Sequence, residues 1–176
     1  FRLPADRALV NRMGLNNDGA LAVAARLAAT PRPPGLVLGV NVAKTHSPDI
    51  LGGAGVDDFR QSVRTLLPHA DYLALNVSCP NTAEGKTFET PDALDALLAA
   101  VMAEVATAEV APPVLVKLSP PPASGVDAGA VDELVRISLG HGVAGFIASN
   151  TAPDRDGLAA GADALEAIGA GGLSGR

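Results

Sequence analysis

The chain has 176 residues, of which 48% are hydrophobic and 18% charged, and this composition is typical of a globular protein rather than a disordered one. The net charge of −6, the absence of tryptophan and an aromatic content of 3% argue against a nucleic-acid partner. One cysteine cannot form an internal disulfide, and the apolar runs are far shorter than the roughly 20 residues needed to cross a bilayer.

Short apolar segments alternate along the chain with longer segments rich in Ala and Leu. We predict strands in the segments RALV, LVLGVNVA, DYLALNV, PVLVKLS and GFIAS, at residues 7–10, 36–43, 71–77, 113–119 and 145–149. Helical patterns cover 18–29, 57–67 and 128–139, and another helix begins at Pro91 after the candidate N-cap Thr90. This order gives about five strand–loop–helix units, which predicts a parallel sheet with crossover helices.

The predicted strands are apolar on both faces, which is typical of a doubly wound sheet or of a (β/α)8 barrel. Polar residues appear where the strands end, and in a barrel such positions meet at one mouth. They are Asn11, Asn16, Asn41, Lys44, Asn76, Cys79, Lys117, Ser149 and Asn150. We therefore predict an α/β fold that is a fragment of a (β/α)8 TIM barrel. Residues 1–176 form a single domain in this prediction, truncated at both ends because a full barrel needs about 250 residues.

Other common sites have no support in the sequence. No GxGxxG motif opens a helix, and GGAG at 52–55 lacks the Lys and Ser/Thr of a P-loop. His46, His69 and His141 are far apart in the sequence, so we predict no metal site.

Six motifs together resemble the dihydroorotate dehydrogenases, which are FMN-containing barrels of pyrimidine biosynthesis. They are NRMGLNN, GVNVAKT, LNVSCPNT, VKLSP, IASNT and GGLSGR, in that order, and the resemblance covers about residues 9–176. The resemblance implies oxidation of (S)-dihydroorotate to orotate. A base removes the C5 proton while hydride passes from C6 to flavin N5.

The resemblance also implies a role for each residue that matches a family motif. Cys79 matches the catalytic base. The substrate-binding positions are Asn11, Arg12, Met13, Gly14, Leu15, Asn76, Asn81, Asn150 and Thr151, and the FMN-binding positions are Asn41, Asn76, Lys117, Ser149 and Gly175. Ser149 replaces the threonine expected at its position but keeps a hydroxyl.

The chemistry of these side chains agrees with such roles. A planar ring with urea-like edges needs paired donors and acceptors, which asparagine amides provide. A lysine can stabilise the negative charge of a reduced flavin, and a thiol can act as a base when it is deprotonated. Each residue also has a structural interpretation. Cys79 can be a small buried apolar residue, Lys117 can extend its charge to solvent, Asn11 and Asn41 can form turns, and Arg12 can support its loop.

The motifs point to two classes within the family. Cysteine at the base position is similar to the soluble class, whereas NRMGLNN, GVNVAKT, PNTAEGKTFE and GGLSGR resemble the quinone-linked class. The larger number of positions favours a quinone as electron acceptor. It also favours a location on the cytoplasmic side, peripheral to the membrane and in contact with it through a segment absent from this chain. A soluble cytoplasmic enzyme linked to fumarate or NAD is the alternative.

Two other functions are compatible with the same fold. A related FMN barrel could act on another dihydropyrimidine, and a non-catalytic barrel could serve as a binding module. The retention of Asn76, Cys79, Asn81 and Lys117 together argues against the second of these.

We find no candidate in the sequence for the first barrel strand or for the last two, where such barrels commonly hold the cofactor phosphate. We therefore expect the 176-residue piece, expressed alone, to aggregate and to bind FMN poorly, because its sheet edges would be open. Gel filtration with flavin absorbance checks this expectation, and a soluble yellow monomer would contradict it.

Overall fold

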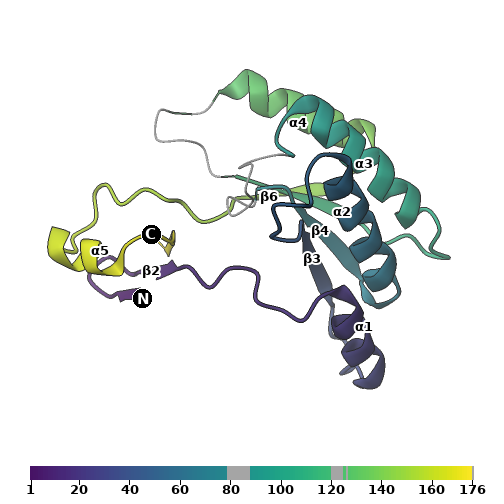
Figure 1. The fold of residues 1–176 in the computed structure, drawn as a ribbon, viewed down its shortest axis with the longest axis horizontal. Coiled ribbons are helices and arrows are strands. Elements are labelled where there is room, and N and C mark those ends of the chain that lie inside the picture. The colour runs from purple at the N-terminus through teal and green to yellow at the C-terminus, as the bar shows by residue number, and fades with distance from the viewer. Residues whose placement is uncertain (79–87, 120–124, 126, 176) are drawn as a thin grey trace.

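The computed structural model describes residues 1–78, 88–119, 125 and 127–175 and contains two sheets (Figure 1). The parallel sheet has the strand order β3-β4-β5-β6, with bounds Gly39–Ala43, Tyr72–Asn76, Val114–Leu118 and Gly145–Ala148. The antiparallel sheet has the order β1-β2-β7, with bounds Arg2–Leu3, Ala8–Asn11 and Gly172–Gly175. The antiparallel sheet lies to one side of the parallel sheet, and both ends of the described chain are in it.

Helices cover one side of the parallel sheet, as expected for crossover connections. In Figure 1, α2, α3 and α4 lie side by side over the strands, and α1 lies beside α2. Their bounds are Ala20–Ala29 for α1, Gly53–Leu66 for α2, Pro91–Val105 for α3 and Ala128–Gly140 for α4; a 3-10 turn spans Leu67–His69, and α5 spans Ala162–Ile168. The predicted fold class, an α/β fragment of the barrel, is thereby confirmed.

The helix α3 shows why this layer forms. Pro91 occupies its first turn, and its apolar side chains recur at steps of three and four residues. Those side chains are Leu94, Leu97, Leu98, Val101 and Val105, all 0–2% exposed. They join Leu73 and Leu75 of β4 and Val114 and Val116 of β5 in the main core. Thr90 occupies the N-cap position as predicted, but its side chain makes no capping hydrogen bond.

The prediction is wrong for the first strand–helix unit. Residues 8–11 form a strand, but β2 pairs with β1 and β7 in the antiparallel sheet rather than with the parallel strands. Its burial alternates, with Ala8 and Val10 buried and Leu9 and Asn11 exposed, as in a sheet covered on one face. The turn after β1 contains Pro4 and closes a hairpin, so a turn signal was present in the sequence.

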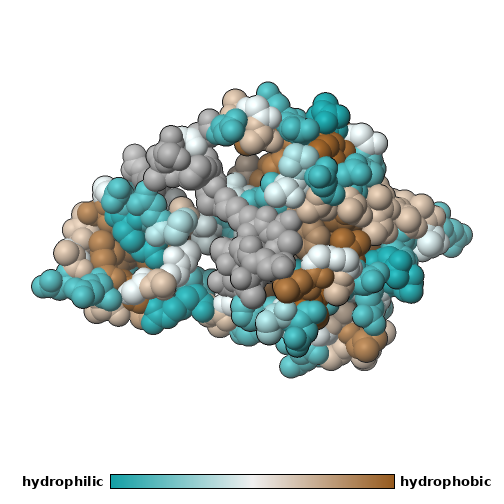
Figure 2. All heavy atoms as spheres, turned by 45° about the horizontal axis from the view of Figure 1, so that its top comes forward, coloured by the Kyte–Doolittle hydropathy of each residue, from teal (hydrophilic) through white to brown (hydrophobic). Residues whose placement is uncertain are grey.

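Burial on both faces holds for the centre of the parallel sheet but not for its margins. In β4 the residues Leu73 to Asn76 are all buried, whereas Asn41 in β3 and Ala148 in β6 are exposed. Within the described residues β3 and β6 each have one neighbouring strand, which explains this difference. Hydrophobic residues also reach the surface at several places in Figure 2, and the described chain includes exposed Met13 and Val37.

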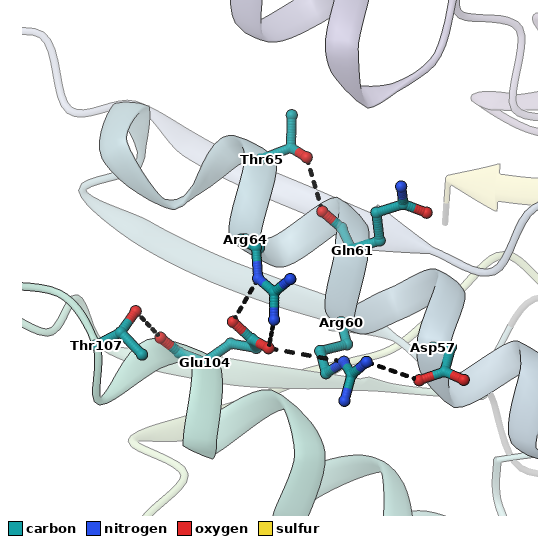
Figure 3. A network of polar contacts seen from close by, with 7 residues as sticks. All are labelled: Asp57, Arg60, Gln61, Arg64, Thr65, Glu104 and Thr107. Carbon is teal, nitrogen blue, oxygen red and sulfur yellow. Dashed lines mark hydrogen bonds and ion pairs between the residues drawn. The ribbon is translucent and has the colours of Figure 1, made fainter.

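An ion-pair network joins α2 to α3 on the outer side of the helical layer (Figure 3). The Glu104 side chain is 10% exposed and accepts two hydrogen bonds from the Arg64 guanidinium, one of them 2.9 Å long from Nε. Arg60 lies 3.6 Å from the same carboxylate. Hydrogen bonding from Arg64 lowers the pKa of the Glu104 carboxyl, and the same contact raises the pKa of Arg64.

Glu104→Gln in the full-length protein should lower Tm by a few degrees at neutral pH, because Arg60 and Arg64 lose their carboxylate partner. The lowered pKa means that this stabilisation is complete above the pKa of the unfolded state and disappears as pH falls through that of the folded state. The Tm difference between variant and wild type should therefore vanish in acid. Thermal unfolding across pH measures this difference.

Glu133→Gln is the matched control, since Glu133 forms an i,i+3 pair with Arg136 in which both side chains are largely exposed. Its Tm should change by less than about one degree. Equal Tm losses in the two variants would contradict the special role of Glu104.

Candidate active site

The register of the parallel sheet places three predicted site residues on one face. Asn76 of β4 is opposite Ala43 of β3 and opposite Lys117 of β5. Alternate residues of a strand face opposite sides, and Val42, Leu75 and Val116 pack under the helices. Asn41, Asn76 and Lys117 therefore share the face that these helices leave free, as expected for residues at the mouth of a barrel.

A chain of hydrogen bonds links the end of β4 to the end of β6. Ser78 Oγ donates to Asn76 Oδ1 over 2.9 Å, and Asn150 Nδ2 donates to Ser78 Oγ over 3.1 Å and to the Ser78 carbonyl over 3.2 Å. The backbone N–H of Thr151 donates to Asn150 Oδ1 over 2.9 Å. The structure thus brings together Asn76, Asn150 and Thr151, three predicted substrate-binding residues.

The end of β2 and the loop after it carry the predicted substrate-binding residues 11–15. Asn11 Oδ1 accepts a hydrogen bond of 2.9 Å from the Met13 backbone N–H, so this side chain does shape a turn. The Arg12 guanidinium donates to the carbonyls of Ile168 and Ala170. Arg12 therefore attaches its loop to the segment before β7, in agreement with the structural interpretation of this residue.

A cavity of about 760 Å³ joins this loop to β3. Its lining includes Arg12, Gly14 and Leu15 from the loop and Asn41 from the strand. Gly14 has a φ of +74°, a conformation that favours glycine. Asn41 lies within β3, so the turn-forming interpretation of this residue is wrong.

Two glycines before and within β7 bring the loop ends together. A Cβ at Gly171 would lie 2.9 Å from the Asn11 carbonyl oxygen, and one at Gly172 would lie 1.9 Å from Thr151 Oγ1. Gly172 is opposite Asn11 in the β2–β7 ladder, and Ala152 bridges to Leu173 on the other side. Because residues 171 and 172 have no side chains, Asn11 and Thr151 can both pack closely against β7 and the residue before it.

The remaining predicted residues have different surroundings. Ser149 Oγ donates to the Asn150 carbonyl over 3.1 Å. Gly175 has a φ of +128°, and a Cβ there would lie 2.7 Å from Ala8 Cα, so packing on β2 alone accounts for a glycine. Cys79 and Asn81 lie outside the described residues, and their roles stay predictions.

Three polar residues that support the site were not assigned a role from the sequence. Ser78 is 1% exposed and connects Asn76 to Asn150. Lys44 is 2% exposed, and its Nζ donates to the carbonyls of Thr45 and Ile50, which shapes the loop after β3. Arg155 donates to the Gly171 carbonyl over 2.6 Å. Ser78 follows β4 in a turn, so strand alternation in the sequence did not point to its contact with Asn76.

A shifted pKa at the other end of β4 concerns the fold rather than this site. The Asp71 carboxylate accepts a hydrogen bond of 2.6 Å from the Leu38 backbone N–H and a further one of 2.8 Å from Arg32. The Leu38 hydrogen bond and, after it, Arg32 lower the pKa of the Asp71 carboxyl. This contact ties the start of β4 to the segment before β3.

The family model for dihydroorotate dehydrogenase matches residues 1–176, the whole chain. The chain belongs to the dihydroorotate dehydrogenase family. It is 47% identical to a dihydroorotate dehydrogenase (quinone) of Mycolicibacterium paratuberculosis, over 99% of this chain and 43% of that protein. It is 42% identical to a protein of the same description from Chloroflexus aurantiacus, over 100% of this chain and 48% of the relative.

A solved structure extends this likeness to three dimensions. The ligand-free crystal structure of the Eimeria tenella enzyme superposes with a TM-score of 0.82 and 28% identity, covering 100% of this chain and 52% of the other. The chain thus spans about half the length of the relatives it matches. The family resemblance inferred from the six motifs is confirmed.

Gly172→Ala in the full-length protein should destabilise the fold by about 1–3 kcal/mol, because the new methyl group overlaps the Thr151 side chain. Denaturant unfolding measures the loss, and the double variant Gly172→Ala/Thr151→Gly should recover part of it. Gly140→Ala is the control, since a Cβ there meets nothing within 4 Å and its stability should be unchanged or slightly raised. Wild-type stability of Gly172→Ala would contradict the contact.

Proposed function

We propose that this protein oxidises dihydroorotate to orotate with FMN as cofactor and a quinone as electron acceptor. The observation that carries the proposal is the linked set of amides at the ends of β4 and β6, beside Lys117 of β5, in a chain of this family. Amide and hydroxyl groups suit a planar ring with alternating carbonyl and N–H groups, because they offer donors and acceptors without net charge.

The described residues fit part of a flavin site. Asn41, Asn76 and Lys117 share the helix-free face of the parallel sheet, and they would hold the polar edge of the flavin ring. FMN, when bound, would supply the acceptor for the hydride that leaves C6 of the substrate. The charge of Lys117 suits a ring that gains negative charge on reduction.

The chain's own residues would orient the substrate and move the proton. Asn76 and Asn150 would fix the ring through their amides, and the loop from Asn11 to Leu15 would close over its polar groups. Cys79, as thiolate, would take the C5 proton, and Ser78 is its neighbour in the chain. The net change in the substrate is loss of one proton and one hydride, which leaves the C5–C6 double bond of orotate.

The acceptor is proposed from the relatives, which are described as dihydroorotate dehydrogenase (quinone). Because quinones dissolve in lipid, we also propose peripheral membrane contact on the cytoplasmic side. Within the described residues, no helix combines the length and the apolar character needed to cross a membrane. Cysteine at the base position keeps fumarate or NAD as the alternative acceptor to be tested.

The test is anaerobic addition of dihydroorotate to the purified full-length protein, followed by flavin absorbance near the usual ~450 nm band. We expect bleaching with dihydroorotate and none with dihydrouracil. Bleaching should be slowed about 10²–10⁴-fold in Cys79→Ala, which lacks the base. Reoxidation by quinone, fumarate or NAD then identifies the acceptor.

The other outcomes are equally informative. A flavin-loaded protein that dihydrouracil bleaches and dihydroorotate does not would be a dehydrogenase of another dihydropyrimidine. A protein that binds flavin but is bleached by neither compound would refute the proposed substrate.

A further inference from the structure

The donors and acceptors in the hydrogen-bond chain between β4 and β6 can be assigned at Asn150. Each end of the Asn150 amide faces a backbone group, and a backbone group can only donate or only accept. The Ser78 carbonyl can only accept, so the Asn150 atom facing it must be Nδ2. The Thr151 backbone N–H can only donate, so the atom facing it must be Oδ1. The amide orientation of Asn150 therefore follows from chemistry.

A further hydrogen bond continues this chain from Ser78 to Asn76. Asn150 Nδ2 also donates to Ser78 Oγ, so the single hydroxyl hydrogen of Ser78 is available for another acceptor. That acceptor is Asn76 Oδ1, 2.9 Å away, and this hydrogen bond holds the Asn76 amide with Oδ1 towards Ser78 and Nδ2 away from it. Ser78 is 1% exposed and Asn76 is 8% exposed, so water has little access to replace these bonds.

We infer that Ser78 is a positioning residue: its hydroxyl turns the Asn76 amide so that Nδ2, a hydrogen-bond donor, is presented to the ligand. Lys117, opposite Asn76 in the β4–β5 ladder, carries a donor on the same face. A donor from Asn76 matches a carbonyl or carboxylate group of the ligand, while the charge of Lys117 remains with the flavin. This inference rests on the proposed function, in which that ligand is dihydroorotate or orotate.

Loss of the hydroxyl would act on ligand recognition as well as on packing. Without Ser78 Oγ, Asn76 Oδ1 lacks its partner and the amide can rotate by half a turn. Asn76 Oδ1, an acceptor, would then face the carbonyl or carboxylate oxygen of the ligand, which also can only accept. A site built to donate a hydrogen bond loses affinity when the donor is withdrawn, because buried polar groups are left unpaired.

The test uses full-length protein loaded with flavin and compares Ser78→Ala with Ser138→Ala. Ser138 is the matched control because it is 0% exposed and its Oγ also donates one hydrogen bond, of 2.8 Å to Leu134, but it lies in α4. Calorimetry gives the orotate Kd, steady-state kinetics give KM and kcat for dihydroorotate, and thermal unfolding gives Tm.

We expect Ser78→Ala to raise the orotate Kd and the dihydroorotate KM about tenfold or more, with a smaller change in kcat. Ser138→Ala should lower Tm to a similar extent and leave Kd and KM unchanged. Ser78→Thr retains the hydroxyl and should recover most of the affinity. If Ser78→Ala does not fold, Ser78→Cys keeps the volume with a weaker donor and should give an intermediate loss.

Two results would overturn the inference while leaving the proposed function intact. One is a folded Ser78→Ala protein with wild-type Kd and KM, and the other is an equal loss of affinity in Ser138→Ala. If the wild-type protein neither binds orotate nor is reduced by dihydroorotate, the proposed function fails and the inference fails with it. The wild-type measurement therefore separates the two failures.

Discussion

The structure depends on the register of β4 between β3 and β5. Because side chains alternate along a strand, one register decides two surfaces at once. It places Leu73 and Leu75 in the core under the helices and Asn76 beside Lys117 on the opposite face. A slip by one residue would exchange these sets, so the hydrophobic effect that fixes the core also fixes the polar site. Burial of the apolar side chains thereby determines where the polar side chains of the candidate site lie.

The polar groups around Asn150 show a second level of control. Side-chain amides are nearly symmetric in shape, so packing alone does not distinguish their oxygen from their nitrogen. Here a backbone carbonyl and a backbone N–H distinguish the two ends of the Asn150 amide, and a hydrogen bond from Ser78 Oγ holds the oxygen end of the Asn76 amide. Backbone contacts thus set the donor end of the Asn150 amide, and the Ser78 hydroxyl sets that of Asn76.

Local patterns in the sequence were sufficient for the parallel sheet and its helices. Leu94, Leu97 and Leu98 recur at helical spacing, and the apolar run before Asn76 marks a buried strand, so both could be predicted without tertiary information. The strand at residues 8–11 was assigned to the wrong sheet because its partner β7 is distant in the sequence. The family motifs predicted which polar residues bind substrate or cofactor, and those roles stay predictions. The motifs did not indicate that Ser78 connects Asn76 to Asn150, because this contact depends on how β4 and β6 are placed.

The pairing of β2 with β7 has a consequence for synthesis on the ribosome. Ala8 pairs with Gly175, so 167 residues (175 − 8) separate the two partners along the chain. At about 5–20 residues per second, β2 emerges roughly ten to thirty seconds before the strand that completes its sheet. The parallel strands and their helices can pair in the meantime, because their contacts are between neighbours in the sequence. Among the described strands the antiparallel sheet is therefore the last to close, and until then β1 is the only one of them that pairs with β2.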